Sequence, residues 1–395
     1  MNEPMLLALG AFMLALVHAL VMEGWRTVIR SAMQRPDGGN SDASPSVSVI
    51  IPARDAESTI GSLLQDLYGQ DMPRDRYEVI VVDDHSADGT SVIVGRMMRS
   101  WEGLRMIQLE NEHGKKAAIM RAAAEAYHDL IVITDADCRC GSSRLSAISG
   151  SWSELRPDML LMPVETCGRK GLIGGVQRME QLALQAVAIG SGAMGYPVLA
   201  NGANMAFSRA TFFQLNGYKN DRWASGDDMF LLQRMRRARK RLAYLTLPEV
   251  VVSVAAESTW RNAYQQRLRW AGKMRSYRDT MVMFTAIAGL LFPWLLIVVT
   301  WHVMGAVEPG QGMVNTSLLL ICAWMFWMLP IIRLVIVMDD FFTHAAARNG
   351  LHHAAKSSLL TGLSTIPALI AFMIYAPLIA IVSIFVRPIW KGRRV

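Results

Sequence analysis

Four long apolar segments stand out along the sequence, one near its start and three in its last third. They cover residues 5–22, 281–301, 317–338 and 363–385. Each has about the 17–25 residues that a helix needs to cross the hydrocarbon core of a bilayer. Arg333 is the one charged residue inside them, and it lies near a segment end, where a long basic side chain usually reaches the interface. We predict four membrane-spanning helices.

Between the first and the second apolar segment, the pattern changes to short apolar runs that alternate with helical periodicity. Strands are predicted at residues 47–51, 77–82, 130–134, 159–164, 242–245 and 250–254. Helices are predicted at residues 56–68, 90–100, 115–127, 172–190 and 230–241. This alternation favours an α/β domain with a mainly parallel sheet covered on both faces. Ligands of such sheets bind beyond the carboxyl ends of the strands.

The same pattern divides the chain into successive parts. We expect a membrane anchor over residues 1–22, a flexible linker over 23–46, an α/β domain over 47–257, an amphipathic helix over 258–280 and a membrane region of about three helices over 281–395. The linker is predicted because its second half is polar and rich in Gly, Ser and Pro. The amphipathic helix is predicted from basic and aromatic residues directly before a span.

The composition agrees with a membrane protein that has a soluble part. Hydrophobic residues make up 52% of the chain and charged residues 18%. The net charge is +7, and the basic residues gather beside the apolar segments rather than in one tract. Membrane lipids with anionic headgroups are therefore the expected partner of this charge, and nucleic acid is not. Cys138 and Cys140 have no second Cys or His pair near them, so we expect no zinc site there.

The charges around the first apolar segment predict its orientation. Glu3 precedes the segment while Arg26, Arg30 and Arg35 follow it, which favours an amino terminus outside and an α/β domain in the cytoplasm. Four full spans then put the basic tail after residue 385 outside, against the same tendency. We expect four full spans, with a re-entrant hairpin near the end as the alternative.

Two acidic residues follow the strand predicted at 130–134. Asp135 and Asp137 are two positions apart, so both carboxylates can lie on one side of the sheet. Hard oxygen ligands of this kind suit Mg²⁺ or Mn²⁺, with waters and substrate phosphates completing the coordination. The alternative is a solvated turn, in which Asp is common.

Other element ends carry residues suited to a nucleotide. Asp83 follows the strand at 77–82, and its carboxylate can accept hydrogen bonds from a nucleobase or a ribose hydroxyl, or can simply end the strand. Lys115 opens a predicted helix, where backbone amides and a Lys favour phosphate. We interpret His113 as a packing or solvent-facing residue rather than a catalytic one.

A second acidic pair stands just before the helix predicted at 230–241. Asp227 and Asp228 are favourable at a helix start for structural reasons alone, but a carboxylate here can also act as a general base toward an acceptor hydroxyl. Asn201 and Gly202 are typical of a turn, which can present its amides to a sugar.

The amphipathic helix before the second span carries a further candidate group. Trp270 can stack on a sugar face, and Gln266 and Arg269 can bind phosphate or acceptor. The rival interpretation makes these three residues an interfacial belt for lipid headgroups.

Taken in order, these residues resemble the inverting GT-A glycosyltransferases of family two. The matching segments are residues 51–55, 82–84, 135–137, 226–228 and 266–270, with the sequences Ile-Pro-Ala-Arg-Asp, Val-Asp-Asp, Asp-Ala-Asp, Gly-Asp-Asp and Gln-Arg-Leu-Arg-Trp. The resemblance covers about residues 47–277 and is nearest to the membrane-integrated branch, which includes cellulose, hyaluronan and chitin-oligosaccharide synthases and ceramide glucosyltransferases. It implies a GT-A domain with a Rossmann-like sheet on the cytoplasmic side of a bacterial inner membrane.

The resemblance also implies a role for each candidate residue. Contacts to the donor nucleotide are implied for Pro52, Asp55, Asp83, Lys115 and Asp135, with Asp83 at the uracil of a UDP-sugar. Asp137 is the implied direct ligand of Mg²⁺ or Mn²⁺, and Asp228 is the implied general base. The diphosphate and the acceptor are implied for Asn201, Gly202, Asp227, Gln266, Arg269 and Trp270. Asp55 departs from the pattern, because relatives often carry Asn there before an acidic pair.

The implied reaction is metal-dependent transfer of a sugar from a UDP-sugar to a lipid-linked or growing glycan acceptor, with inversion to a β-linked product. Three classes stay open: a processive polysaccharide synthase, a single-addition glycolipid synthase, and a non-enzymatic transporter or scaffold that binds nucleotide. Transport is disfavoured because few of the predicted spans carry internal polar groups. The sequence leaves open a partner subunit that completes a channel.

Overall fold

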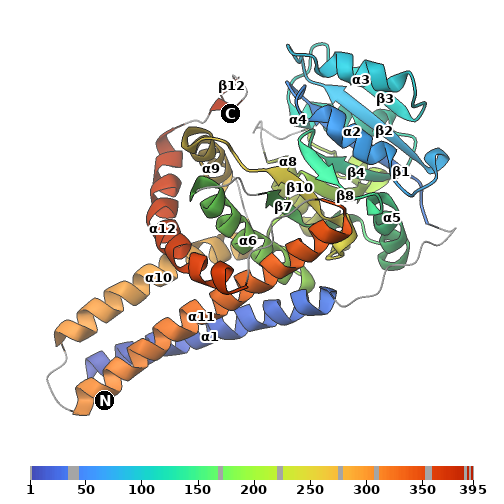
Figure 1. Ribbon diagram of the computed structural model, residues 1–395. Helices are drawn as coiled ribbons and strands as arrows, with labels where there is room; N and C mark the ends of the chain where they lie inside the picture. The colour runs from blue at the N-terminus through green and yellow to red at the C-terminus, as the bar shows by residue number, and fades with distance from the viewer. Residues whose placement is uncertain are drawn as a thin grey trace.

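The computed structural model describes residues 2–33, 44–167, 172–219, 226–274, 279–306, 311–351, 358–386, 389–390 and 393–394. A sheet domain forms one end of the protein, and long helices extend from it toward the end that carries the amino terminus (Figure 1). The architecture is therefore an α/β domain joined to a bundle of helices, as the sequence predicts.

The main sheet has seven strands in the order β3-β2-β1-β4-β8-β6-β9. Their bounds are β1 (Val47–Ala53), β2 (Tyr77–Asp83), β3 (Leu104–Gln108), β4 (Leu130–Thr134), β6 (Met159–Leu161), β8 (Asn204–Ser208) and β9 (Leu242–Tyr244). Only β8 runs antiparallel to its neighbours, β4 and β6, so the predicted mainly parallel sheet is confirmed. The register pairs Ala53 with Asp83, which brings the ends of β1 and β2 to the same edge.

Helices cover both faces of this sheet. One face packs against α2 (Ile60–Tyr68), α3 (Thr90–Met98) and α5 (Arg144–Leu155), and the other against α4 (Lys115–Glu125), α7 (Arg209–Gln214) and α8 (Asp227–Arg237). Val49 and Ile51 of β1 point to the first core and Ile50 to the second, and all three are fully buried. A strand buried on both faces needs a continuous apolar run rather than an alternating one, which explains the sequence of β1.

A small second sheet lies beside the acidic end of β4. It pairs β5 (Cys138–Cys140), β10 (Val252–Ala255) and β7 (Val164–Cys167), in the order β5-β10-β7. Because β5 begins one residue after Asp137 and β10 ends shortly before α9 (Trp260–Met274), this sheet ties the two candidate regions together. Two short 3-10 helices, η1 (Arg74–Arg76) and η2 (Pro248–Val250), complete the domain.

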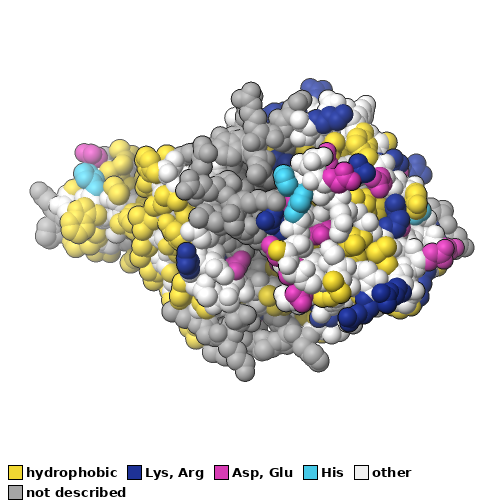
Figure 2. Space-filling view, turned by 90° about the horizontal axis from the view of Figure 1, so that it is seen from above, with side chains coloured by type: hydrophobic (Ala, Val, Ile, Leu, Met, Phe, Trp, Pro, Cys, Tyr) yellow, Lys and Arg dark blue, Asp and Glu magenta, His cyan; other side chains and the backbone are white. Residues whose placement is uncertain are grey.

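Among the residues that the structure describes, four helices are long and apolar enough to cross a membrane. They are α1 (Glu3–Met33), α10 (Thr280–Ala306), α11 (Gln311–Arg348) and α12 (Ser358–Phe385), followed by the short strands β11 (Ile389–Trp390) and β12 (Arg393–Arg394). Figure 2 shows hydrophobic side chains gathered over the helical end and charged ones over the sheet domain. The large apolar side chains of Trp301 and Phe385 are 84% and 81% exposed, as expected for helices that face lipid.

The linker predicted for residues 23–46 is wrong in its first part. Helix α1 continues through these residues to Met33, because Trp25 and Ile29 are buried against α6 (Leu172–Ala193) and α11. Residues 34–43 lie outside the described part of the chain. Several further elements were not predicted from the sequence, among them β3, β5, β7, β8, α5 and α7. The basic tail residues Arg387 and Lys391 lie outside the described residues as well.

A buried ion pair crosses the junction between the sheet domain and the membrane helices. Arg178 of α6 donates from Nε to Oδ1 of Asp339 on α11 over 3.0 Å, and these side chains are 9% and 3% exposed. Glu165 of β7 lies 3.8 Å from the same guanidinium. Loss of one partner from a pair this buried leaves the other charge uncompensated, so the pair fixes α6 against α11.

Glu165 makes the stability of this junction depend on pH. Burial raises the pKa of Glu165 to about 7, although Arg178 opposes the rise. The folded protein therefore holds this proton more tightly than the unfolded chain, where the carboxyl has a pKa of 4.5. We expect the free energy of unfolding to fall as pH rises from 4.5 to about 7, and Glu165→Gln to weaken that fall. Melting temperatures at the two ends of this range test it, and identical changes in both proteins would contradict it.

Candidate active site

Lys115 lies at the centre of the candidate site. Its Nζ contacts Oδ1 of Asp135 at 2.7 Å and Oδ2 of Asp227 at 3.2 Å, and donates a hydrogen bond to the carbonyl of Gly202 over 3.1 Å. These partners come from the end of β4, the start of α8 and the loop before β8. Lys115 itself opens α4 after Gly114, whose φ of 92° is accessible to glycine at low cost. One ammonium group thus gathers residues that are far apart in the sequence.

Gly202 allows this close approach. A Cβ at this position would meet Oδ2 of Asp227 at 2.6 Å and Nζ of Lys115 at 2.8 Å, so a side chain here would push the ends of these two side chains aside. The side chain of Asn201 accepts a hydrogen bond from the Ala203 amide over 3.0 Å, which fixes the predicted turn. Both residues therefore shape the backbone around Lys115.

Asp228 faces the same turn from the first turn of α8. Its Oδ2 accepts a hydrogen bond from the Gly202 amide over 3.2 Å, and its Oδ1 accepts one from the Met229 amide over 2.7 Å. The second bond is the structural role expected of an acidic residue at a helix start. The first bond aims the carboxylate at the site, which is the position a general base needs.

The charges of the site are strongly coupled. Burial lowers the pKa of Lys115, but Asp135 and Asp227 outweigh it, and the resulting pKa lies above the usual range for Lys. Burial raises the pKa of Asp135, with Lys115 opposing and Asp137 adding to the rise. The Lys115 ammonium therefore remains charged and holds the carboxylates around it.

Arg269 joins this group from α9. Burial lowers the pKa of Arg269, and the charges of Asp135, Asp227 and Asp228 oppose that fall. The guanidinium therefore lies in the field of the same carboxylates that surround Lys115. The site therefore combines the positive charges of Lys115 on α4 and Arg269 on α9 with these carboxylates.

Asp137 is exposed at the edge of this group, next to a cavity of about 230 Å³. Arg139 and Ser253 are among the residues that line the cavity. Asp135 and Asp137 repel each other, and a divalent cation between them would relieve that repulsion. The residues fit the predicted Mg²⁺ or Mn²⁺, with Asp137 as the more accessible ligand because Asp135 is engaged by Lys115.

The residues predicted to contact the nucleobase lie at the carboxyl ends of β1 and β2. Asp83 is buried, and its two oxygens accept hydrogen bonds from the Ser86 amide over 3.1 Å and the Ser91 hydroxyl over 2.8 Å. Asp55 accepts a hydrogen bond from the Ala87 amide over 2.9 Å. Both carboxylates hold the loop after β2 in place, and each keeps acceptor capacity for a base or ribose. Pro52, in β1, pairs with Val82 at this edge.

Gln266 and Trp270 have partners that sequence analysis missed. Gln266 donates to Glu257 over 3.3 Å and accepts from Arg267 over 2.8 Å. The Arg267 guanidinium lies 5.3 Å from the centre of the Trp270 ring and is paired with Glu180 of α6, Nε to Oε2 at 2.9 Å. The structure thus joins Gln266 and Trp270 to a buried Arg267 network, whereas Arg269 joins the Lys115 group.

Two further residues of the site lacked a recognisable sequence pattern. Arg54 lies 3.6 Å from Asp55 and 3.8 Å from Asp84. Glu257 contacts Gln266 and also acts on the charge of Arg269. The available signals were weak: Arg54 lies within the matching segment 51–55 but was given no role of its own, and Glu257 stands just before the amphipathic helix.

Two sequence-family models match this chain. The sequence model described as Glycosyl transferase family 2 matches residues 48–196, and the model described as Glycosyl transferase family group 2 matches residues 176–339. The two matches overlap and together run from β1 into α11. Residues 48–339 are thus matched by two glycosyltransferase models, and the predicted class of enzyme, a glycosyltransferase, is confirmed.

Individual relatives support the same family. A probable glycosyltransferase, YdaM of Bacillus subtilis, is 26% identical over 238 residues, which are 59% of this chain and 56% of that protein. The beta-monoglucosyldiacylglycerol synthase of Synechocystis is 30% identical over 129 residues, 31% of this chain and 27% of that protein. The chain thus spans about half or less of the length of these relatives.

The fold is similar to that of the mannosyltransferase PcManGT from Pyrobaculum calidifontis, whose structure holds GDP-Man and Mn²⁺. The TM-score is 0.54 at 22% identity, covering 88% of this chain and 98% of that chain. Together with the family match, this likeness confirms the predicted GT-A fold.

Proposed function

We propose that this protein is an inverting glycosyltransferase that moves a sugar from a UDP-sugar to a lipid or growing glycan at the membrane. The observation that carries the proposal is the convergence on Lys115 of Asp135, Gly202 and Asp227, from three separate elements. The charges of Asp135 and Asp227 also act on the Arg269 guanidinium. Such a group of cations and carboxylates suits a leaving diphosphate and an attacking hydroxyl in one place.

Departure of UDP is the step that needs positive charge. Lys115 and Arg269 can donate to the diphosphate, and a Mg²⁺ or Mn²⁺ ion held by Asp137 would supply further charge. Asp135, which contacts Lys115, would lie close enough to help hold the ion and the donor. The nucleoside end of the donor extends toward Asp83, Asp55 and Pro52 at the carboxyl ends of β1 and β2.

Attack by the acceptor needs a base on the other side of the sugar. Asp228 is held by the Gly202 and Met229 amides with its carboxylate toward the turn, and it takes the proton of the acceptor hydroxyl. A single displacement inverts the anomeric carbon, so an α-linked donor gives a β-linked product. Asn201, Gly202 and Asp227 border the acceptor at this turn.

The acceptor reaches the site from the bilayer side. Helix α9, which carries Gln266, Arg269 and Trp270, packs on membrane helix α12 and directly precedes α10. We assign catalysis to residues 47–257 with α9, on the cytoplasmic face of a bacterial inner membrane, and the amino terminus to the outside. A relative named for glucosyl transfer to diacylglycerol supports a lipid acceptor.

Membranes that contain the protein, supplied with a panel of radiolabelled nucleotide sugars and then extracted for lipid, test this proposal. We expect label from one UDP-sugar in the lipid fraction as a single added sugar, and a ladder of product lengths would indicate a processive synthase instead. Binding of UDP-sugars without transfer or hydrolysis would contradict the proposal and favour a non-enzymatic nucleotide-binding protein.

Removal of the proposed metal ligand should change the metal dependence. In Asp137→Ala, we expect the Mn²⁺ concentration for half-maximal activity to rise at least about 10-fold, because the ion loses its direct protein ligand. Asp71→Ala, which removes another exposed carboxylate of the same domain, is the matched control and should leave the Mn²⁺ titration unchanged. Equal titrations for Asp137→Ala and the unmodified protein would count against the cation site.

A further inference from the structure

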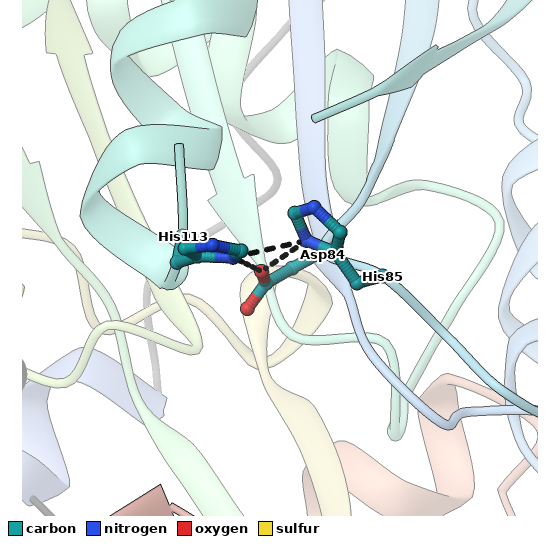
Figure 3. A group of neighbouring side chains, drawn as sticks. All are labelled: Asp84, His85 and His113. Atoms are coloured by element: carbon teal, nitrogen blue, oxygen red, sulfur yellow. Dashed lines mark hydrogen bonds and ion pairs between the residues drawn. The ribbon is translucent and has the colours of Figure 1, made fainter. Parts of the chain in front are cut away.

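A second cluster of possible metal ligands lies at the nucleobase end of the sheet. Figure 3 shows the side chains of Asp84, His85 and His113 pointing toward one another. Asp84 and His85 follow β2, while His113 comes from the loop before α4. Asp84 is buried, and the two imidazoles cover it, with side chains 32% and 57% exposed.

The distances between the ligand atoms of this cluster are close to those between the ligands of a bound metal ion. Nδ1 of His85 lies 3.2 Å from both Oδ1 of Asp84 and Nδ1 of His113, and Nδ1 of His113 lies 3.8 Å from Oδ1 of Asp84. Four ligands at about 2.0–2.1 Å from a tetrahedral Zn²⁺ are separated by about 3.3–3.4 Å. A small movement of the loop that carries His113 would shorten the distance from its Nδ1 to Oδ1 of Asp84 to this length.

The hydrogen bond on the far side of His85 fixes where its lone pair lies. Nε2 of His85 is 3.2 Å from the carbonyl oxygen of Glu110, which can only accept, so Nε2 carries the hydrogen. In the neutral imidazole, Nδ1 is then an acceptor, and it faces the acceptor Oδ1 of Asp84. Two acceptors at this distance require either an extra proton or a cation between them. A carbonyl partner behind a ligating His is also the usual arrangement around metal ions.

The backbone of His85 points to the same conclusion. Its φ of 57° lies in the left-handed region, which is uncommon outside glycine and in which His is enriched among the other residues. Asp84 is oriented by a second contact, since its Oδ2 lies 3.8 Å from Arg54. This conformation places the His85 imidazole between the carboxylate of Asp84 and the imidazole of His113.

We propose that Asp84, His85 and His113 bind a transition-metal ion such as Zn²⁺, with a water as the fourth ligand. Nitrogen ligands distinguish this ion from the Mg²⁺ or Mn²⁺ proposed for Asp137. The ion links the loop after β2 to the loop that leads into Lys115, and so it holds the two ends of the donor site at a fixed spacing. The ion is expected to bind whether or not the protein transfers a sugar.

Metal content of the purified full-length protein tests this proposal. Protein stripped with a chelator is equilibrated with Zn²⁺ alone, and bound zinc is measured together with the visible absorption of a Co²⁺-substituted sample. We expect one ion per chain with the strong absorption of tetrahedral Co²⁺. His113→Asn should weaken Zn²⁺ binding by at least about 10–100-fold, the loss that even an outer partner of a ligand can cause.

The choice of variants separates binding from folding. His85→Gly removes the imidazole while it relieves the left-handed backbone, so it should fold yet lose the ion. His128→Asn, at a half-buried histidine elsewhere in the domain, and Asp137→Ala should both retain it. X-ray absorption at the zinc edge of the unmodified protein reads the two imidazole ligands without any variant. Zinc that is absent from the unmodified protein, or that is lost in Asp137→Ala but kept in His113→Asn, would overturn the proposal.

Discussion

Replacement of Asp228 by Asn should reduce kcat by about 10²–10⁴-fold, the usual contribution of a general base. Asn has nearly the same size and keeps an oxygen that can accept the Met229 amide, but it cannot take a proton from the acceptor. UDP binding should change little, because the diphosphate is assigned to Lys115, Arg269 and the metal ion. Single-turnover transfer rates and calorimetric UDP binding measure the two effects separately.

The control for this variant is Asp71→Asn, which makes the same chemical change at an exposed position of the domain. It should transfer sugar at the unmodified rate. Turnover of Asp228→Asn near that rate would show that another group is the base. Loss of UDP binding together with activity would instead assign Asp228 to the donor.

The second large effect is expected from a single added methyl group. A Cβ at Gly202 would lie 2.6 Å from Asp227 and 2.8 Å from Lys115, well inside van der Waals contact, so the ends of these two side chains must move. Displacement of a catalytic group by about 1 Å can cost 10²-fold in rate. We therefore expect kcat/KM of Gly202→Ala to fall by about 10²-fold, with weaker UDP binding because Lys115 is displaced.

Gly95→Ala is the matched control for this prediction. Gly95 lies within α3, and a Cβ there meets no atom within 4 Å. Alanine is also the better helix former, so this variant should be at least as stable and fully active. If Gly202→Ala were as active as Gly95→Ala, the close contact around Lys115 would have no role in transfer.

The strands that the sequence predicts best are those buried on both faces. β4 was predicted at residues 130–134, where it is found, because five successive apolar or small residues before an acidic turn allow few alternatives. β3 and β8 were missed because each carries polar residues, such as Arg105 and Asn204, whose pairing depends on partners elsewhere. Arg105, for example, is held by Glu78 of β2.

The helices show the same dependence on tertiary contacts. α1 extends eleven residues beyond the predicted anchor end at Met22, to Met33. Polar residues follow Met22, so the local pattern favours an end there, but Trp25 and Ile29 are buried against other helices. Packing of this kind overrides local preference, and no local pattern reports it.

The residues of the candidate site also differ in how far the sequence predicts their positions. The ends of parallel strands meet at one edge, so a pattern of acidic residues at strand ends was enough to bring Asp83 and Asp135 to that edge. The partners of Gln266 and Trp270 depend on Arg267 and on Glu180, a residue of α6 that only folding brings near. His113 was interpreted as packing or solvent-facing, and its position beside His85 comes from two loops that are distant in sequence.

The most direct test of the account is a structure of the full chain with Mn²⁺ and a non-transferable UDP-sugar analogue. We expect the ion on Asp137, the diphosphate between the ion, Lys115 and Arg269, and the carboxylate of Asp228 facing the anomeric carbon on the side opposite UDP. A donor bound elsewhere, or a donor with Asp228 and Arg269 directed away from it, would contradict the central claim.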